Sequence, residues 1–148
     1  MHRQFISFSL VFTLLLIPSV SAFSHCEIPC GIYDDKMRIT MLEEHITTIE
    51  KAMGQIMDLQ DGDNKNQLIR WVVNKEDHAN QFQEIVSQYF LTQRIKKEDK
   101  QYGQMLEVLH QMLVYAMKCK QTVDLDNVAK LKELVNEFDK LYFASHTE

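Results

Sequence analysis

The sequence predicts an all-α fold, an antiparallel four-helix bundle, and three observations lead to this prediction. Beyond residue 33, glycine occurs only three times and proline does not occur. Apolar residues recur at intervals of three and four over four long stretches, which is the spacing of a buried helical stripe. Short polar segments separate these stretches, and amphipathic helices joined by short turns bury their apolar stripes against one another as a bundle.

Residues 1–24 have the pattern of a secretory signal peptide rather than of the folded domain. Arg3 gives a basic start, residues 5–22 contain no charged side chain, and residues 10–17 form a dense apolar core that Pro18 ends. An uncleaved membrane anchor is the alternative, but the apolar stretch is short for a membrane span and proline interrupts it. We expect a peptidase to remove this leader, which would leave no stable membrane association.

Two cleavage sites fit the preference of signal peptidases for small residues. Cleavage after Ala22 would leave Phe23 and Ser24 ahead of His25, whereas cleavage after Ser24 would make His25 the first residue. The leader predicts export, to a periplasm or out of the cell. Phe23 directly after a signal cleavage site is also compatible with onward targeting to a plastid through the secretory route, and a cytoplasmic location is the remaining alternative.

The chain of 148 residues is expected to form one domain, with residues 25–34 as an N-terminal hook and residues 35–148 as the bundle. The first helix is predicted from about residue 35 to residue 60, with Asp34 or Asp35 as its N-cap. Its expected buried stripe consists of Ile39, Leu42, Ile46, Ile49, Met53 and Ile56. Residues 61–64, Asp-Gly-Asp-Asn, form the clearest turn in the chain.

Three further helices complete the predicted bundle. The second starts near residue 66 and fades around residues 95–97, the third runs from about 99 to 120, and the fourth follows a turn at residues 123–126. Their inner faces are predicted to comprise Leu68, Trp71, Val72, Ala79, Phe82, Ile85, Val86 and Tyr89, then Tyr102, Met105, Leu109, Met112 and Ala116, then Val128, Leu131, Val135, Phe138 and Tyr142.

The charge of the chain excludes two classes of partner. The formal net charge is −5 at pH 7, whereas proteins that bind nucleic acid or anionic membrane surfaces carry basic patches. The composition therefore argues against both kinds of binding. It also means that the overall field mildly repels an anionic substrate, so any electrostatic steering of an anion must be local.

The densest group of metal-binding atoms lies in residues 25–33, His-Cys-Glu-Ile-Pro-Cys-Gly-Ile-Tyr. Pro29 and Gly31 favour a rigid, tight turn that directs the sulfurs of Cys26 and Cys30 toward one centre. If cleavage frees His25, its α-amine, its imidazole and the Cys26 amide nitrogen lie beside these sulfurs. Sulfur and nitrogen ligands in a planar arrangement favour nickel(II) or copper(II). A disulfide between the two cysteines, or a redox-active dithiol, is the alternative.

The same stretch resembles the nickel-binding hook of the nickel superoxide dismutases, whose pattern is His-Cys-x-x-Pro-Cys-Gly-x-Tyr. Every specified position is matched, by His25, Cys26, Pro29, Cys30, Gly31 and Tyr33. The resemblance implies that His25, Cys26 and Cys30 bind one nickel ion per chain, and that Ni(II)/Ni(III) cycling converts superoxide to oxygen and hydrogen peroxide. It also implies a four-helix bundle with the hook at the N-terminus of the first helix, and assembly as a homohexamer.

The resemblance assigns roles to two tyrosines. Tyr33 would guard the access of superoxide, and Tyr89, within the segment Ser87-Gln88-Tyr89-Phe90, would back the site. The family also supports the N-terminal imidazole with an acidic residue and an arginine. Residues 75–78, Lys-Glu-Asp-His, lie near the place where that arginine is expected, and no matching arginine is found there.

A function of another class is the alternative: a secreted helical-bundle binding protein with a Cys26–Cys30 disulfide and no metal. Outside the hook, Cys119 is predicted to be a buried thiol rather than a ligand. Glu107 and His110 have the spacing of half a di-iron site, but no second Glu-x-x-His pair accompanies them. We therefore expect these two residues to lie on a solvated helix face.

Overall fold

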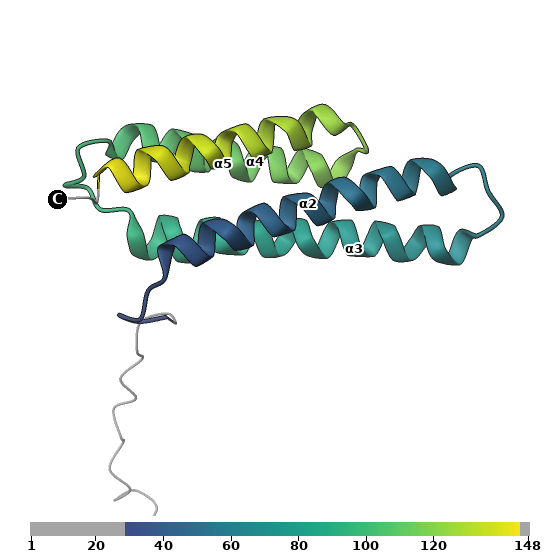
Figure 1. Ribbon diagram of the computed structural model, residues 1–148, viewed down its shortest axis with the longest axis horizontal. Helices are drawn as coiled ribbons and strands as arrows, with labels where there is room; N and C mark the ends of the chain where they lie inside the picture. The colour runs from purple at the N-terminus through teal and green to yellow at the C-terminus, as the bar shows by residue number, and fades with distance from the viewer. Residues whose placement is uncertain (1–28, 146–148) are drawn as a thin grey trace, which may run out of the picture.

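The computed structural model describes residues 29–145, in which helices α2 (Asp35–Leu59), α3 (Lys65–Glu84), α4 (Tyr102–Gln121) and α5 (Leu125–Ser145) pack against one another (Figure 1). A π-helix, η1 (Ile85–Arg94), continues α3 directly. No strand occurs within residues 29–145. The predicted all-α four-helix bundle is therefore confirmed.

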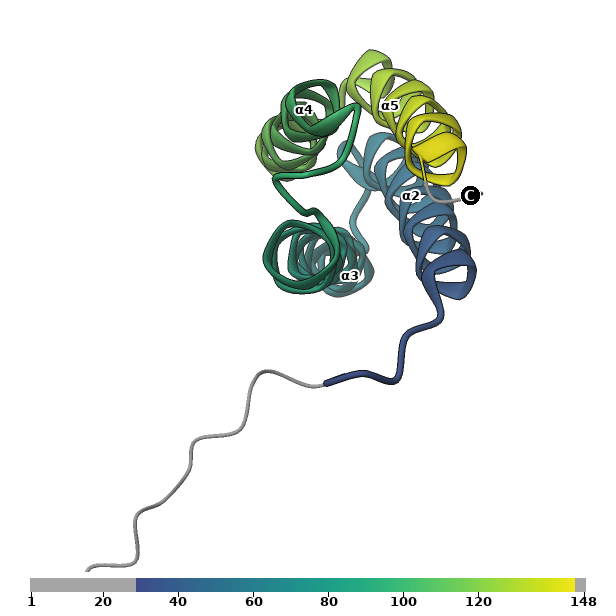
Figure 2. The ribbon, with the colours of Figure 1, turned by 90° about the vertical axis from the view of Figure 1, so that its left-hand side faces the viewer.

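The four helices stand at the corners of a square when the bundle is seen from the end at which α2 begins (Figure 2). Helix α2 packs against α3 and α5, and α4 packs against the same two helices from the opposite corner. Successive helices run in opposite directions because short turns join them. The start of α2, the end of η1 and the end of α5 consequently meet at one end of the bundle (Figure 1).

Side-chain caps fix the beginnings of α2 and α3. The carboxylate of Asp34 accepts a hydrogen bond of 3.0 Å from the backbone N–H of Met37, and the side chain of Asn64 accepts one of 3.2 Å from the N–H of Gln67. Each cap satisfies a donor that the first helical turn leaves without a partner. Because Asp34 is the cap of α2, the side chain of Asp35 is available for other contacts.

The predicted apolar stripes of the first and fourth helices are buried throughout. The second stripe is correct only in its later part, from Ala79 to Tyr89. Val72 is 38% exposed, and Leu68 and Trp71 are half-buried. The physical reason is that the α2–α3 pair extends beyond the turn between α4 and α5 (Figure 1), so the first half of α3 has fewer neighbours. None of the helices in residues 29–145 has the length and apolar character required to cross a membrane.

The second helical stretch ends at Arg94, close to the predicted boundary, but its last ten residues are π-helical. The N–H of Ile95 donates to the carbonyl of Phe90 at 3.0 Å, the five-residue spacing of a π-turn. The wider turns change which residues face α2 and the core. Tyr89 and Phe90 are buried side by side, while Arg94 reaches the first turn of α2.

Candidate metal centre

The described part of the hook is the segment Pro29–Tyr33, which leaves the bundle at the start of α2 (Figure 1). Gly31 has φ +78°, a left-handed conformation that glycine adopts without steric cost. The predicted tight turn beside Cys30 is therefore present, and Cys30 lies in an exposed position. The two other predicted ligands, His25 and Cys26, lie outside the described residues.

The sulfur of Cys30 is in a disulfide. The third cysteine of the chain, Cys119, is a free thiol, so the partner of Cys30 lies outside the described residues. Thiolates, not disulfides, bind metal ions. Nickel binding by the hook therefore requires reduction of this bond, and the disulfide by itself is compatible with both of the functions that the sequence suggested.

Cys119 is fully buried on α4, as predicted. Burial raises the pKa of its thiol to about 11, so Cys119 is a neutral thiol at neutral pH and a poor metal ligand. Glu107 and His110 are exposed on the same helix, also as predicted. Among residues 29–145, no group of three or more His, Cys, Asp or Glu side chains is arranged to hold a metal ion.

Tyr33 connects the hook to the bundle. Its ring packs edge-on against the ring of Tyr89, with centroids 5.9 Å apart, and the guanidinium of Arg94 lies 4.2 Å from the centre of its ring. Tyr33 as a whole remains 37% exposed. Tyr33 thus lies between the exposed hook and a partly buried group of polar side chains, a position that fits a residue at the mouth of a site.

The centre of that polar group is the carboxylate of Asp35, which accepts four hydrogen bonds. Arg94 binds it through both nitrogens of its fork, Nε to Oδ1 at 2.8 Å and Nη2 to Oδ2 at 2.7 Å. The hydroxyl of Tyr89 donates to Oδ1 at 2.6 Å, and that of Tyr142 donates to Oδ2 at 2.8 Å. We call these four residues the Asp35 cluster; it joins α2, η1 and α5.

The protonation states of the Asp35 cluster follow from its contacts. Burial alone would raise the pKa of Asp35, but the hydrogen bonds from Arg94, Tyr89 and Tyr142 outweigh it and hold the pKa below its ordinary value. Burial, followed by the hydrogen bond to Asp35, raises the pKa of each tyrosine. The carboxylate is therefore ionised and both hydroxyls are protonated donors at neutral pH.

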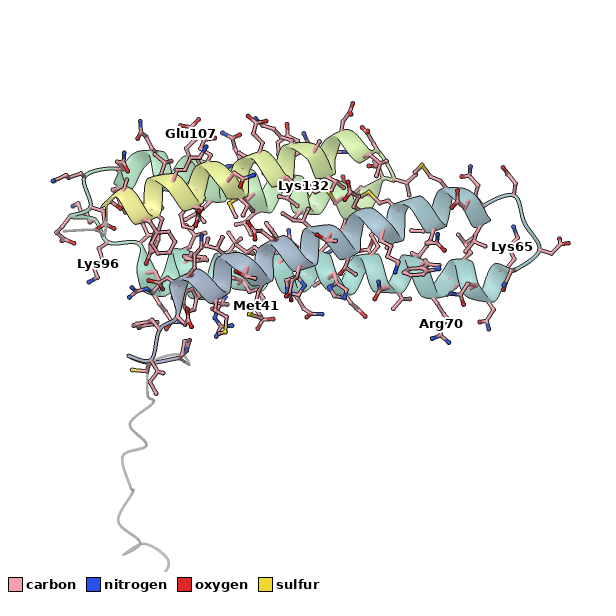
Figure 3. All side chains as sticks on the ribbon, viewed as in Figure 1. Met41, Lys65, Arg70, Lys96, Glu107 and Lys132 are labelled. Atoms are coloured by element: carbon pink, nitrogen blue, oxygen red, sulfur yellow. The ribbon has the colours of Figure 1, made fainter. Side chains whose placement is uncertain are left out.

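A cavity of about 250 Å³ opens beside the hook and the Asp35 cluster. Pro29 of the hook lines it, together with Arg38, Met41 and Tyr89. The guanidinium of Arg38 lies 5.0 Å from the centre of the Tyr89 ring, and its Nη1 donates to the sulfur of Met41 at 3.6 Å. Met41 lies on the side of α2 from which the hook leaves (Figure 3). This cavity is a small space beside the described part of the hook, and Arg38 and Glu84 bring one charge of each sign to its lining.

The arginine of the family was expected near residues 75–78, and the lysine found there, Lys75, binds the end of another helix. Lys75 is buried on α3, and its ammonium donates to the carbonyls of Cys119, at 2.7 Å, and of Lys120. These carbonyls belong to the last turn of α4, which has no helical partners for them. Lys75 thus closes a helix end. The arginine that contacts the hook tyrosine is Arg94, and its guanidinium binds Asp35.

Sequence reasoning missed Asp35, Arg94 and Tyr142 as parts of the site, although two signals were available. Two consecutive aspartates stand at the start of the first helix, and a helix needs only one cap. Arg94 follows Tyr89 by five residues, which places both side chains on one face only in a π-helix. Tyr89 packs against Tyr33, and its role behind the metal site stays a prediction.

The donor set of the hook fits nickel. Cys30 is presented at an exposed turn that can bring its sulfur close to neighbouring donors, and the sequence supplies His25 and Cys26 within five residues of it. Sulfur and nitrogen ligands together are typical of nickel and copper rather than of magnesium or calcium.

Comparison with known proteins separates the two functions that the sequence suggested. No curated protein and no solved structure matches the chain. The model of a protein family described as nickel-containing superoxide dismutase matches residues 19–146. The match covers the hook and all four helices, so it joins the motif and the bundle in one family, and nothing supports a metal-free binding protein. The chain belongs to the nickel-containing superoxide dismutase family.

Proposed function

We propose that this nickel superoxide dismutase binds its nickel through His25, Cys26 and Cys30. The observation that carries the proposal is the family match over residues 19–146, combined with a hook in which every specified position of the family's pattern is present. Nickel, when bound, supplies the one-electron chemistry that oxidises one superoxide to oxygen and reduces the next to hydrogen peroxide.

The ligands make this chemistry accessible. Aqueous nickel(II) is too hard to oxidise for superoxide to drive the cycle. The anionic thiolates of Cys26 and Cys30, and the deprotonated amide of Cys26, would donate charge to a bound nickel ion and so make it easier to oxidise. Cys26 therefore serves twice, through its sulfur and through its backbone nitrogen. His25 contributes its α-amine and its imidazole, and only a chain that begins at His25 has that amine.

Tyr33 and Tyr89 control what reaches the metal. The contacts of Tyr33 with Tyr89 and Arg94 hold its ring beside the hook, where it can restrict the site to a ligand as small as superoxide. Tyr89 backs this arrangement, and its hydroxyl is fixed by Asp35. Tyr33 can therefore act as a positioned gate rather than as a freely rotating side chain.

Arg38 supplies local steering for an anion in a chain of net negative charge. Its guanidinium lines the cavity beside Pro29, and within the described residues its buried Nε has no hydrogen-bond partner. Buried donors usually have a partner, so a donor without one can bind a small anion or a water molecule. Positive charge in a concave site attracts anions even when the whole molecule repels them.

The maturation, location and assembly of the enzyme form part of the same proposal. Residues 1–24 act as a leader whose removal by a processing peptidase exposes His25, and the protein is exported or reaches a plastid by the secretory route. Assembly as a homohexamer is what the resemblance to the family implies, and apolar side chains on the protruding half of α3 would give it a contact surface: Ile69, Val72 and Val73 are 60%, 38% and 51% exposed. Such a patch is typical of an interaction surface.

The test of the metal site is elemental analysis of cysteine variants. Cys26→Ser and Cys30→Ser should each lose bound nickel and dismutase activity while keeping their helical circular dichroism, because the core lies after the hook. Cys119→Ser is the matched control and should keep both nickel and activity. Retention of nickel by either hook variant, or its loss from the control, would show that the metal is elsewhere.

A further inference from the structure

Two histidines outside the hook face each other across α2 and α3. The Nδ1 atoms of His45 and His78 are 2.9 Å apart, and the two rings are tilted by 59° with centroids 5.1 Å apart. His45 is buried, with 8% of its surface exposed, and His78 is half-buried. The proposed dismutase chemistry assigns no role to this pair.

The distance between the two nitrogens fits a hydrogen bond and also the coordination of one metal ion. As a hydrogen bond, it requires that one Nδ1 carries the proton and the other accepts it. With metal–nitrogen bonds of about 2.0–2.1 Å, two ligands at adjacent corners of a square lie about 2.9 Å apart, whereas two tetrahedral ligands lie about 3.3 Å apart. Small ring rotations would direct both lone pairs at an ion that replaces the shared proton.

The cavity beside the pair is lined by polar side chains and can hold water. His45 lines the cavity of about 250 Å³ beside the hook, and the thioether of Met41 and the side chains of Gln81 and Glu84 line it too. Met41 is one helical turn before His45, on the side of α2 from which the hook leaves (Figure 3). The space leaves room for water ligands, and Pro29 places the hook at its edge.

The protonation state of His45 suits a metal ligand, because its imidazole is neutral rather than positively charged. Burial, followed by the charge of His78, holds the pKa of His45 below its ordinary value, against a smaller opposing effect of Glu44. The imidazole of His45 is therefore neutral at neutral pH. A neutral imidazole is the form that binds metal ions.

We propose that His45 and His78 form a second metal site, beside the hook, for a divalent nickel or copper ion. Two imidazoles prefer these ions to magnesium or calcium, and the square arrangement that matches their spacing is typical of nickel(II) and copper(II). Within the described residues no third His, Cys, Asp or Glu joins them. The ion is therefore held by two protein ligands and water, which makes the site weak and exchangeable.

The site can be tested without the hook. In a mature chain carrying His25→Ala, Cys26→Ser and Cys30→Ser, here called the hook-silent protein, the two thiolates and the imidazole of the hook are removed. Tag-free hook-silent protein is titrated with nickel(II) and with copper(II) by calorimetry, and the copper form is examined by electron paramagnetic resonance. The expected result is one ion per chain, with nitrogen splitting from two imidazoles.

Two variants of the pair and one control decide the result. In the hook-silent protein, His45→Gln and His78→Gln should each weaken binding by at least tenfold, and His110→Gln, at an exposed histidine on α4, should have no effect. Because His78 is less buried than His45, His78→Gln keeps the test valid if His45→Gln unfolds, which circular dichroism would show. No binding by the hook-silent protein, or equal binding in all three variants, overturns the proposal.

The place of this site suggests that it holds nickel on its way to the hook, a role that rests on the proposed function. With an intact hook and nickel below one equivalent, His78→Gln should slow the appearance of the thiolate-to-nickel absorption, while the final intensity stays the same. Equal loading rates in His78→Gln and His110→Gln would contradict this role. Failure of the hook itself would appear differently, as absence of the absorption from every protein.

Discussion

Asp35 and Lys75 are two charges, one partly buried and one buried, that the bundle neutralises in different ways. The Asp35 side chain is 16% exposed and the Lys75 side chain 4%. Asp35 lies at the hook end and accepts its hydrogen bonds from three side chains, those of Arg94, Tyr89 and Tyr142. Lys75 donates to the backbone carbonyls of Cys119 and Lys120 at the end of α4, and to its neighbour Glu76.

The two sets of partners indicate that Asp35 supports the metal site, whereas Lys75 supports only the fold. Two of the three side chains that bind Asp35 also contact the hook, because Arg94 and Tyr89 pack against Tyr33. A change at Asp35 can therefore move the gate of the site. The partners of Lys75 are main-chain atoms of a helix end, so a change there affects the stability of the bundle and has no direct path to the hook.

The largest effect is expected from Asp35→Asn. It leaves Arg94 without its counter-charge and replaces a carboxylate that accepts four hydrogen bonds. Removal of one partner from a buried ion pair costs about 3–5 kcal/mol; since this pair is partly exposed, we expect a loss of about 2–4 kcal/mol, measured by urea unfolding. Activity per bound nickel should also fall. Asp34→Asn is the control, because asparagine caps a helix as well as aspartate does.

Lys75→Met should destabilise the bundle without affecting catalysis. Hydrogen bonds to charged groups contribute about 1.5–3 kcal/mol, and their loss leaves carbonyls of α4 without partners. The urea midpoint should fall, while activity per bound nickel stays equal to that of the unchanged protein. Lys97→Met, at an exposed position, should alter neither. A fall in activity per nickel in Lys75→Met would place Lys75 in the support of the metal site after all.

The pH dependence of stability should distinguish the two charges further. The folded pKa of Asp35 is lowered, so its contribution to stability is present above the unfolded value of about 3.9 and is lost as the pH falls through the folded pKa. The stability difference between the unchanged protein and Asp35→Asn should therefore be constant from pH 7 to pH 5 and shrink below about pH 4. Urea unfolding across this range measures it. A difference that persists at the lowest pH would mean that the charge of Asp35 is not the cause.

The smallest effect is expected from Tyr33→Phe. The ring contacts with Tyr89 and Arg94 remain, so stability and nickel content should not change. Loss of the hydroxyl should alter the saturation of the enzyme with superoxide or its sensitivity to peroxide, measured by pulse radiolysis or stopped flow. If the variant matches the unchanged enzyme at all superoxide concentrations, Tyr33 serves packing only.

Local patterns predicted most of the fold. The stripe from Ile39 to Ile56 repeats at helical spacing, and burial followed from that spacing alone. Val72 has equally good spacing but is exposed, because its burial depends on the relative lengths of two helix pairs. The spacing of apolar residues within one helix does not indicate that the α2–α3 pair extends beyond the α4–α5 pair.

The candidate site likewise has one part that could be predicted from the sequence and one part that could not. The hook is one continuous motif, which could be recognised in the sequence, and the roles of His25 and Cys26 stay predictions. The Asp35 cluster joins residues up to 107 positions apart, and its geometry depends on a π-helix. The His45–His78 pair likewise requires the pairing of two helices. Contacts of this kind follow only from the assembled bundle.

The most direct test of the account compares two N-termini. The α-amine of His25 can donate a lone pair to nickel only when no residue precedes it, and with a pKa of about 8 it must lose its proton to bind. Chains beginning at His25 and at Ser24 are expressed, verified by mass spectrometry, loaded with nickel and assayed. We predict that the chain beginning at His25 is active, and that the chain beginning at Ser24 is folded and inactive. Full activity of the chain that retains Ser24 would contradict the account, because the amine could then not be a ligand.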